Sequence, residues 1–513
     1  MYVEARRDGT TGPAPTRRYL ESMADRILVR LAAELTIKSR RTRSVFLRRL
    51  VRNLGDALRG ADVEHRIETD WGRIYVHADA RRALPVLTRV FGISSVSTVE
   101  RTVPAELAEI VAAGEALYRT TVADRRFAVR ARRVGQHPFH SKDVEVELGA
   151  ALLPHAAGVD LSDPDVTIHV EVRDQNAFLF SERVAGPGGL PLGVEGNAVA
   201  LLSGGYDSAV AAWLMLRRGI ELDYVFCNLG GDAYERAVVH VAKLLADEWS
   251  FGSRPHLHAL DFGPVLDELR ARVRPAYWQV VLKRLMYRAA LQVAAQRGAE
   301  AIITGEAVGQ VSSQTLTNLR AIDRIAELPV FRPLLGFEKG EIIERARDIG
   351  TAALSEQVRE YCAIAPGRPV TAASVTAVDE QEARLDLGVI DVAVAQRKVI
   401  DLRALQPTDL VAPYLFAEAI PHGAVVIDCR PRTQYRSWHL KGAEHREEWE
   451  ILKEFRRLDR DRVYILYCAH GIQTAYIAER MQRAGFEAYS FRGGLRGIMK
   501  YAQEQGLNVQ LLK

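Results

Sequence analysis

The sequence is poor in cysteine, with 4 in 513 residues. They stand far apart and form none of the paired spacings that hold zinc, so we expect no metal site made of protein side chains alone. A chain of this length can also bury a core without disulfides. We therefore expect reduced thiols and a cytoplasmic protein. The four positions are Cys227, Cys362, Cys429 and Cys468.

Long apolar runs are missing as well. No segment approaches the roughly 20 apolar residues that span a bilayer, and the first residues lack the apolar stretch of a signal peptide. There is no internal repeat and no low-complexity segment. With 48% hydrophobic and 26% charged residues, the chain is typical of a globular protein with several domains and no membrane contact. Residues 1–23 are predicted to be a disordered tail.

The net positive charge is small, but it is concentrated in one part of the chain. The net charge is +4, yet residues 1–60 hold 14 Lys and Arg against 6 Asp and Glu. A basic segment of this kind is typical of a protein that binds a polyanion. Residues 39–59 also carry apolar residues at helical spacing, so an ordinary solvated helix explains the same pattern. A second basic run lies on a predicted strand, at Arg125, Arg126, Arg130, Arg132 and Arg133.

The first part of the chain predicts two small α+β units. Alternation of apolar and polar residues indicates strands, and helical spacing indicates helices. A turn-rich hinge at 186–193 fits a domain boundary. The expected strands are 26–37, 65–78 in two parts, 94–103, 125–134 and 165–184 as a pair, and the expected helices are 39–59, 81–92, 105–119 and 141–155.

The later part of the chain changes character. Residues 198–350 alternate strand and helix, which predicts a parallel sheet wound on both faces, with its ligand beyond the carboxyl ends of the strands. Residues 374–406 are predicted to be a charged helical connector. After Pro421 the pattern predicts a compact α/β module.

A phosphate-binding loop is indicated after the strand at 198–202, in the peptide Ser203-Gly204-Gly205-Tyr206-Asp207-Ser208. Glycines let backbone amides approach an anion, and amides at a helix start bind phosphate without a lysine. The spacing is not that of a Walker loop. It resembles the SGGxDS loop of ATP pyrophosphatases. The alternative is a tight Gly-Gly turn with Asp207 as a helix cap.

Two later segments supply polar groups for such a site. Gly305 follows the strand at 301–304 and opens a polar segment that includes Glu306, Gln310 and Gln314. Lys283 lies on a predicted helix that can reach the same place. Taken singly, Lys283 is as well explained as a surface lysine and the polar segment as a loop.

Cys468 ends a strand and precedes a helix, in the order Cys468-Ala469-His470-Gly471. The partial positive charge of a helix start predicts a lowered thiol pKa and a reactive thiolate, which suits a persulfide. Buried filler is the alternative for any lone cysteine, and we prefer it for Cys227 and Cys429. Cys362, in an irregular segment, is either incidental or a second thiol that breaks a mixed disulfide.

Taken together, these runs resemble the tRNA 4-thiouridine synthetases of the ThiI family, in the long form with a C-terminal rhodanese domain. The resemblance covers residue 24 to the end. It rests on Glu34 to Ser39, Phe91 to Ser95, Leu202 to Ser208, Thr304 to Asn318, Glu360 to Cys362, and Cys468. It implies a ferredoxin-like domain at 24–78, a THUMP domain at 79–185, an α/β ATP pyrophosphatase (PP-loop) domain at 186–373, a linker at 374–415 and a rhodanese-like α/β domain at 416–513.

The resemblance also implies site residues, cofactors and partners. Cys468 carries the persulfide, Cys362 forms a transient disulfide with it, and Asp207 is catalytic. ATP and Mg²⁺ are the cofactors; tRNA, a cysteine desulfurase and a cellular disulfide reductant are the partners, and a homodimer is left open. The ATP site comprises Leu201, Leu202, Ser203, Gly204, Gly205, Asp207, Ser208, Lys283, Gly305 and Gln314. From the two basic segments we expect the RNA site to comprise Lys38, Arg125, Arg126, Arg130, Arg132 and Arg133.

The implied activity is ATP-dependent transfer of persulfide sulfur to a uridine of tRNA, giving 4-thiouridine at position 8 through an adenylated tRNA. A role in sulfur supply for the thiamine thiazole is implied too. Two alternatives stay open. A small-molecule ATP pyrophosphatase explains the loop and leaves the basic segments and Cys468 unused, whereas an RNA-binding sulfur carrier leaves the loop unused.

Overall fold

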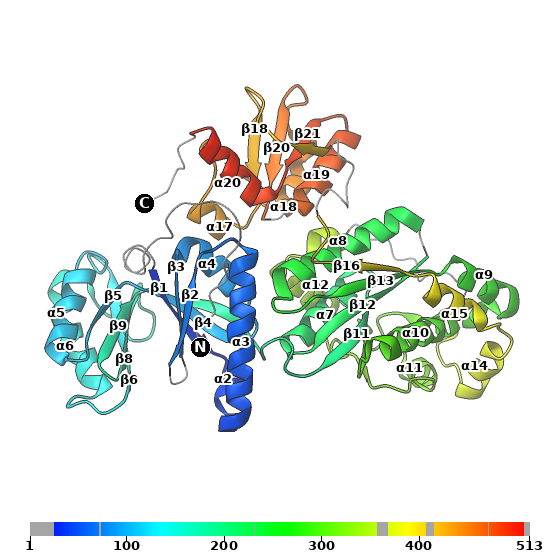
Figure 1. Ribbon diagram of the computed structural model, residues 1–513, viewed down its shortest axis with the longest axis horizontal. Coiled ribbons are helices and arrows are strands. Elements are labelled where there is room, and N and C mark those ends of the chain that lie inside the picture. The colour runs from blue at the N-terminus through cyan, green and yellow to red at the C-terminus, as the bar shows by residue number, and fades with distance from the viewer. Residues whose placement is uncertain are drawn as a thin grey trace, which may run out of the picture. The chain divides into compact units, whose positions relative to one another are not determined.

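The computed structural model describes residues 25–70, 73–229, 231–356, 368–406, 415–469 and 471–506 (Figure 1). These residues form four sheets, and the chain divides into two compact units. Within the described ranges, no helix combines the length and the apolar character that crossing a membrane requires. The first unit comprises the chain up to Leu31, Leu58–Thr88 and Ile93–Gly186, and the second comprises Ala32–Ala57, Arg89–Gly92 and the chain from Pro187.

The first sheet is antiparallel around β1 (Asp25–Leu31), with strand order β10-β4-β1-β3-β2. The expected strand at 26–37 is wrong beyond Leu31. Its pairing with β4 becomes irregular between Arg30 and Leu31, and Ala33–Thr36 form helix α2 instead, because backbone groups past the ladder need partners of their own. The other strands are β2 (Arg66–Asp70), β3 (Arg73–Ala78), β4 (Ile93–Val99) and β10 (Val184–Gly188).

The first sheet also ends later than expected. The predicted strand at 94–103 is two strands: β4 belongs to the first sheet and β5 (Arg101–Pro104) to the second. The sheet therefore extends past the expected boundary at residue 78, and Ile93–Ser95 belong to it. The expected hinge contributes to it as well, as β10. Gly186 is required there, because a Cβ would lie 2.5 Å from the carbonyl oxygen of Ile93.

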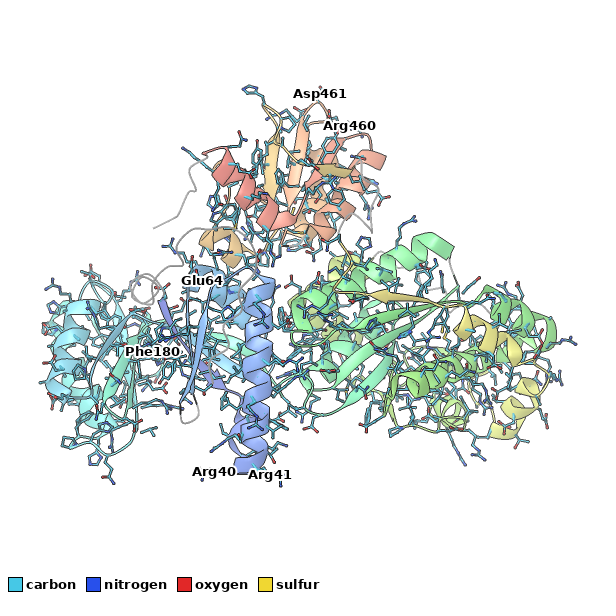
Figure 2. The ribbon with its side chains drawn as sticks, in the orientation of Figure 1. Arg40, Arg41, Glu64, Phe180, Arg460 and Asp461 are labelled. Atoms are coloured by element: carbon cyan, nitrogen blue, oxygen red, sulfur yellow. The ribbon has the colours of Figure 1, made fainter. Side chains whose placement is uncertain are left out.

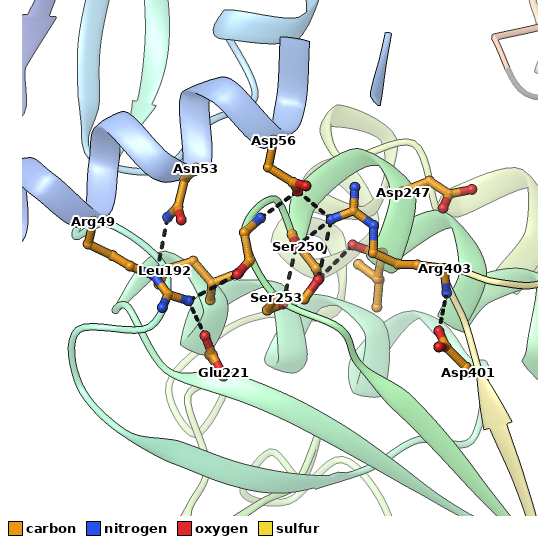
Figure 3. Close-up of polar contacts among 12 residues, drawn as sticks. Arg49, Asn53, Asp56, Leu192, Glu221, Asp247, Ser250, Ser253, Asp401 and Arg403 are labelled. Carbon is orange, nitrogen blue, oxygen red and sulfur yellow. Dashed lines mark hydrogen bonds and ion pairs between the residues drawn. The ribbon is translucent and has the colours of Figure 1, made fainter. Parts of the chain in front are cut away.

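Helix α3 (Arg40–Gly60) confirms the predicted basic helix, and the second unit uses one of its faces (Figure 3). Arg49 donates hydrogen bonds to the carbonyls of Leu192 at 2.7 Å and Gly252 at 3.1 Å. Asp56 accepts from the amide of Gly252 at 2.7 Å and from Arg403 at 2.6 Å. Part of this basic helix is thus an internal polar contact surface.

Other basic residues of α3 remain exposed. Arg40 and Arg41, in its first turn, extend away from the ribbon (Figure 2). These exposed arginines are the ones to which both explanations of the basic segment still apply.

The second sheet has the order β5-β9-β8-β6-β7. Phe127 and Val129 of β6 and Ile168 of β8 are buried with Leu148 on the helical side. Because side chains alternate along a strand, the even-numbered arginines of β6 lie on the opposite face. Its elements are α5 (Leu107–Tyr118), β6 (Arg126–Val134), α6 (Ser141–Leu152), β7 (Gly158–Val159), β8 (Val166–Arg173) and β9 (Asn176–Phe180); α4 (Ala80–Leu87) precedes them.

The third sheet has the predicted doubly wound design. Its order is β15-β14-β11-β12-β13-β16, and every pair is parallel except β13 with β16. Ala200 and Val199, neighbours on β11, belong to separate buried clusters on its two faces. The elements are β11 (Asn197–Leu201), α7 (Tyr206–Arg217), β12 (Glu221–Asn228), α8 (Gly231–Trp249), β13 (His256–Asp261), α9 (Gly263–Arg272), α10 (Trp278–Arg297), β14 (Ile302–Ile303), α11 (Leu316–Asp323), β15 (Val330–Phe331), α12 (Lys339–Asp348) and α13 (Ala352–Ser355).

The segment expected to be a connector packs on this sheet. It forms helices α14 (Val375–Glu382) and α15 (Gly388–Ala395), as predicted, and then an edge strand, β16 (Lys398–Asp401). The fully buried Arg284 of α10 pairs with Asp379 at 2.6 Å and Glu382 at 2.7 Å. The charged residues of the expected connector thus include Asp379 and Glu382, which are the partners of the buried Arg284.

The fourth sheet is parallel throughout, with the order β17-β21-β20-β18-β19. In the register of β18 and β20, Asp428 lies opposite Tyr467. Both strands end at a cysteine. The elements are β17 (Phe416–Ala417), β18 (Val425–Asp428), α17 (Arg432–Ser437), β19 (Glu444–His445), α18 (Glu448–Glu454), β20 (Val463–Tyr467), α19 (Ile472–Arg483), β21 (Glu487–Phe491) and α20 (Gly494–Glu504).

We expect Arg284→Met to lower the free energy of unfolding by about 3 kcal/mol, because it removes the fully buried one of the two arginines that pair with the buried Glu382 carboxylate. Urea unfolding of the full chain, followed by circular dichroism, measures this loss. Arg288→Met is the matched control: Arg288 pairs with Glu382 at 2.7 Å but is 33% exposed, so its loss should be about 1 kcal/mol or less. Equal losses of unfolding free energy in the two variants would contradict the conclusion that the burial of Arg284 makes its loss the larger one.

Candidate functional site

The predicted phosphate loop lies at the carboxyl end of β11 and leads into α7. Gly204 has a φ of +78°, which favours glycine. The Ser208 hydroxyl accepts from the amide of Ser203 at 3.2 Å and donates to the carbonyl of Gly205 at 3.2 Å. These bonds fold the loop tightly over the first turn of α7 and leave its glycine amides at the helix start, where an anion is stabilised.

A cavity opens beside this loop at the carboxyl ends of the parallel strands. Lys283 enters it from α10, and Gly305 and Gln314 come from the segment after β14. Of the ten expected ATP-site residues, Gly204 alone is not among those that line it. The lining residues are Leu201, Leu202, Ser203, Gly205, Asp207, Ser208, Val225, Phe226, Cys227, Leu229, Tyr234, Gln279, Lys283, Met286, Tyr287, Thr304, Gly305, Glu306, Gln310, Val311, Ser313 and Gln314.

Gly305 brings the two halves of the cavity together. A Cβ at this position would lie 2.6 Å from the backbone carbon of Asp207 and 2.6 Å from the amide nitrogen of Ser208. Side chains do not make such contacts with backbone atoms. Steric exclusion therefore explains why residue 305 is a glycine, which its position after a strand only suggested.

Asp207 is held by two residues that the sequence did not single out for it. The Lys339 ammonium lies 2.8 and 3.0 Å from its two carboxylate oxygens, and Gln310 donates to it at 2.9 Å. Lys339 begins α12 and also lies over the ring of Tyr206. No local signal identifies Lys339, because its partner is 132 residues away.

Lys283 faces a buried carboxylate. Its ammonium is 3.7 Å from Glu306, which also accepts hydrogen bonds from Tyr287 at 2.7 Å and Arg332 at 2.9 Å. Burial works to raise the pKa of the Glu306 carboxyl, but Lys283 and Arg332 hold it below its ordinary value. Glu306 is thus an anion that positions Lys283 at the cavity.

Gln314 offers an unused acceptor. Its side chain is buried, and its Oε1 atom has no hydrogen-bond partner among the described residues. Since a buried polar atom without a partner is costly, an acceptor placed in a cavity wall is suited to a ligand donor.

The expected RNA-binding residues lie in both compact units. Lys38, before α3, lies over the ring of Phe46, and Arg125 is exposed just before β6. Arg126, Arg130 and Arg132 share the face of β6 that is not covered by helices, whereas the alternation of the strand directs Arg133 to the other face.

The arginines on this face of β6 differ in how many of their charges are already paired. Arg126 pairs with Asp160 at 2.8 Å, and Arg130 donates to the carbonyl of Leu161. Arg132 is exposed. The positive potential here is therefore centred on Arg130 and Arg132, not distributed evenly along the basic run.

His169 of β8 lies opposite Arg130 on the same face and was missed by the sequence reasoning. Its ring stacks on Phe180 at 5.1 Å. Burial, followed by the charges of Arg30, Arg183, Arg130 and Arg132, lowers its pKa to about 4. Burial favours the neutral ring most, and the four arginines add a positive potential that favours it further.

Cys468 occupies the predicted strand-to-helix turn in the fourth sheet. The amide of Gly471 donates to its Sγ at 3.2 Å, and the Thr474 hydroxyl lies 3.5 Å away. The expected lowering of its pKa is wrong. Burial, reinforced by the Glu448 carboxyl, raises the pKa of this thiol, and the hydrogen bonds only oppose the rise. At 2% exposure, loss of hydration outweighs the helix start.

The remaining cysteines differ. Cys362 lies outside the described residues, so the disulfide expected from it stays a prediction. Cys227 is buried and lines the cavity of the third sheet. Cys429 is a buried free thiol at the end of β18, and its pKa is raised well above the ordinary value, first by burial.

Comparison with known families covers most of the chain. The profile described as the ThiI ferredoxin-like domain matches residues 26–97, and the THUMP domain matches 104–182. The profile described as thiamine biosynthesis protein (ThiI) matches 193–387, and the rhodanese-like domain matches 413–501. The four matches follow the four sheets in order.

Individual relatives match over nearly the whole length. The chain is 38% identical over 472 residues to the tRNA sulfurtransferase of Pyrobaculum aerophilum, covering 91% of this chain and 96% of that protein. It is 39% identical to the tRNA sulfurtransferase of Desulfurococcus amylolyticus, with 91% and 97% covered. A solved 4-thiouridine synthetase, in a complex with RNA and bound ATP, is 31% identical, with a TM-score of 0.63 and coverage of 73% of this chain and 99% of that one.

We expect the resting Cys468 thiol to react slowly with iodoacetamide at neutral pH. Because its pKa is raised, little thiolate is present, and the rate should rise about tenfold per unit between about pH 7 and 9. Mass spectrometry of the Cys468 peptide measures the rate; a rate that is fast and independent of pH would contradict the raised pKa.

Proposed function

This chain belongs to the tRNA sulfurtransferase family, and we propose that it uses ATP to transfer persulfide sulfur to a uridine of tRNA, giving 4-thiouridine at position 8. The observation that carries the proposal is the presence of two chemically distinct sites in one chain. A phosphate loop lines a cavity in the third sheet, and a cysteine ends a central strand of the fourth. The first activates the uridine, and the second delivers sulfur.

ATP occupies the cavity beside the phosphate loop in this proposal. The loop amides and Lys283 face the phosphates, while the buried Oε1 atom of Gln314 accepts a donor from the nucleotide. Asp207 lies beside the loop. In this proposal its contacts with Lys339 and Gln310 are replaced by contacts with the reacting groups when the substrates bind. These residues stabilise the charge that develops as the uridine oxygen displaces pyrophosphate and takes AMP.

Mg²⁺ fits this site. The described residues contain no cluster of three His, Cys, Asp or Glu that would bind a metal by itself. Mg²⁺ does not require one, because it is usually held by one or two carboxylates together with substrate phosphates. Asp207 is the carboxylate beside the loop, and the bound ion would neutralise the leaving pyrophosphate.

The face of the second sheet that carries Arg130 and Arg132 is proposed to bind the RNA backbone. These two exposed arginines provide its cationic centre. Backbone phosphates are the groups such a face attracts, and their contacts give affinity without sequence selectivity. The exposed Arg125, just before β6, is proposed to add to this basic face, and Lys38 and the exposed start of α3 are proposed as separate contacts with the RNA.

Sulfur is proposed to arrive on Cys468 from a cysteine desulfurase. The persulfide then attacks C4 of the adenylated uridine directly, or Cys362 attacks it first and releases sulfide at the site. Either route ends in a disulfide between Cys362 and Cys468, which a cellular reductant reopens. The ThiI relationship extends the proposal to sulfur transfer for the thiamine thiazole.

We expect Asp207→Ala to reduce tRNA-dependent AMP formation on the order of a hundredfold or more, because it removes a preorganised charge beside the reacting phosphate. Affinity for tRNA should stay within a few fold, since the basic faces are unchanged. Radiolabelled ATP and a filter-binding assay measure the two quantities. Asp348→Ala is the matched control: Asp348 ends α12 with only an i,i+3 partner, Arg345.

The same experiment separates the alternatives. AMP formation by wild-type protein without tRNA would indicate a small-molecule ATP pyrophosphatase. Unchanged thiolation by Asp207→Ala would indicate a sulfur carrier that does not use the loop.

We expect Arg132→Ala to weaken tRNA binding and to reduce the slope of log affinity against log salt by about 1, as the loss of one phosphate contact requires. Arg126→Ala is the matched control on the same face of β6. Its charge is already paired with Asp160, so its effect on the slope should be smaller. Titrations at several salt concentrations test the difference, and equal slopes for Arg132→Ala and wild type would place the RNA elsewhere.

A further inference from the structure

Two thiols lie side by side at the ends of adjacent strands. In the parallel pairing of β18 with β20, Asp428 is opposite Tyr467, and the next residues are Cys429 and Cys468. The ladder extends this far, because the amide of Cys429 donates to the carbonyl of Tyr467 at 2.9 Å. Neighbouring strands are about 4.8 Å apart, which falls within the Cα separation of disulfides, about 4.4–6.8 Å.

The two side chains also share one face of the sheet. Side chains alternate along a strand, so Cys429 lies on the face of Ile427, and Cys468 on that of Leu466. All four residues belong to one buried cluster beneath α18 and α19. The Glu448 carboxyl acts on both thiols, which places them around a common group.

We propose that Cys429 is a second sulfur-handling residue: its thiol attacks the Sγ atom of the Cys468 persulfide and closes a Cys429–Cys468 disulfide. The inference rests on the proposed function, in which Cys468 carries the persulfide. The bond that forms joins the two Sγ atoms, and the bond that breaks joins Cys468 to its terminal sulfur. The terminal sulfur leaves as hydrogen sulfide with the proton of Cys429. A cellular thiol reductant then supplies two electrons to reopen the disulfide.

The chemistry of Cys429 makes this a slow route. Its exposed fraction is 1%, and its raised pKa keeps it protonated, so its nucleophilic form is scarce. Transfer to an activated uridine is therefore not intercepted while tRNA is present. A persulfide that waits without an acceptor is discharged, which spares Cys468 from irreversible oxidation. This disulfide and the one expected with Cys362 exclude each other, because both use Cys468.

The test compares two full-length variants, Cys362→Ser and Cys362→Ser/Cys429→Val. Each is loaded anaerobically by a cysteine desulfurase with cysteine, desalted, and kept without tRNA or reductant. The first should release one sulfide for each disulfide formed, with the Cys429 and Cys468 peptides joined. The second should retain its persulfide and release sulfide at least tenfold more slowly. Cys429→Ala in place of Cys429→Val checks that the result does not depend on core packing.

Equal sulfide release by both variants, or alkylation of both thiols after release, overturns the inference. Loading itself provides the control for folding, since the double variant must still accept one sulfur on Cys468. The experiment also distinguishes a failure of this inference from a failure of the proposed function. If wild-type protein loads and thiolates tRNA but no Cys429 disulfide forms, only this inference is wrong; if Cys468 does not load, the proposed function is wrong as well.

Discussion

The cavity of the third sheet depends on one close backbone contact. Gly305 lies so near Asp207 and Ser208 that no other side chain fits between them. Because β11 and β14 are adjacent parallel strands, their exits meet at this point, and the contact fixes the distance between the phosphate loop and the segment carrying Glu306 and Gln314. Groups far apart in the sequence become one charged site through a constraint that involves no charge.

Much of this arrangement could be predicted from the sequence. The loop and the strand and helix alternation identify the doubly wound sheet and the edge where its ligand binds, and all but one of the expected ATP-site residues line the cavity. Lys339 could not be found, because its contact with Asp207 is created only by the return of α12 to that edge. The division of residues 94–103 between two sheets could not be predicted either. The alternating pattern is continuous over these residues and does not show that β4 pairs in the first sheet and β5 in the second.

The error over Cys468 has a different origin. The local argument was correct in its parts: the helix start is present, and an amide does donate to the sulfur. It failed because hydration is lost when the whole domain closes over the thiol, and a strand and turn pattern contains no measure of depth. His169 adds a second case, since its pKa is lowered first by burial and then by arginines that three separate segments contribute.

The antiparallel edge strand β16 determines where the chain can be divided. It covers the open hydrogen-bonding edge of β13, and unpaired edges of this kind recruit foreign strands and cause aggregation. A fragment that ends at residue 387, where the match to the nucleotide-domain profile stops, would leave that edge bare. Recombination that exchanges the rhodanese-like module would therefore be tolerated only beyond the buried Leu402 and the Arg403 that binds Asp56, so the modular boundary of this protein lies inside what sequence comparison treats as its linker.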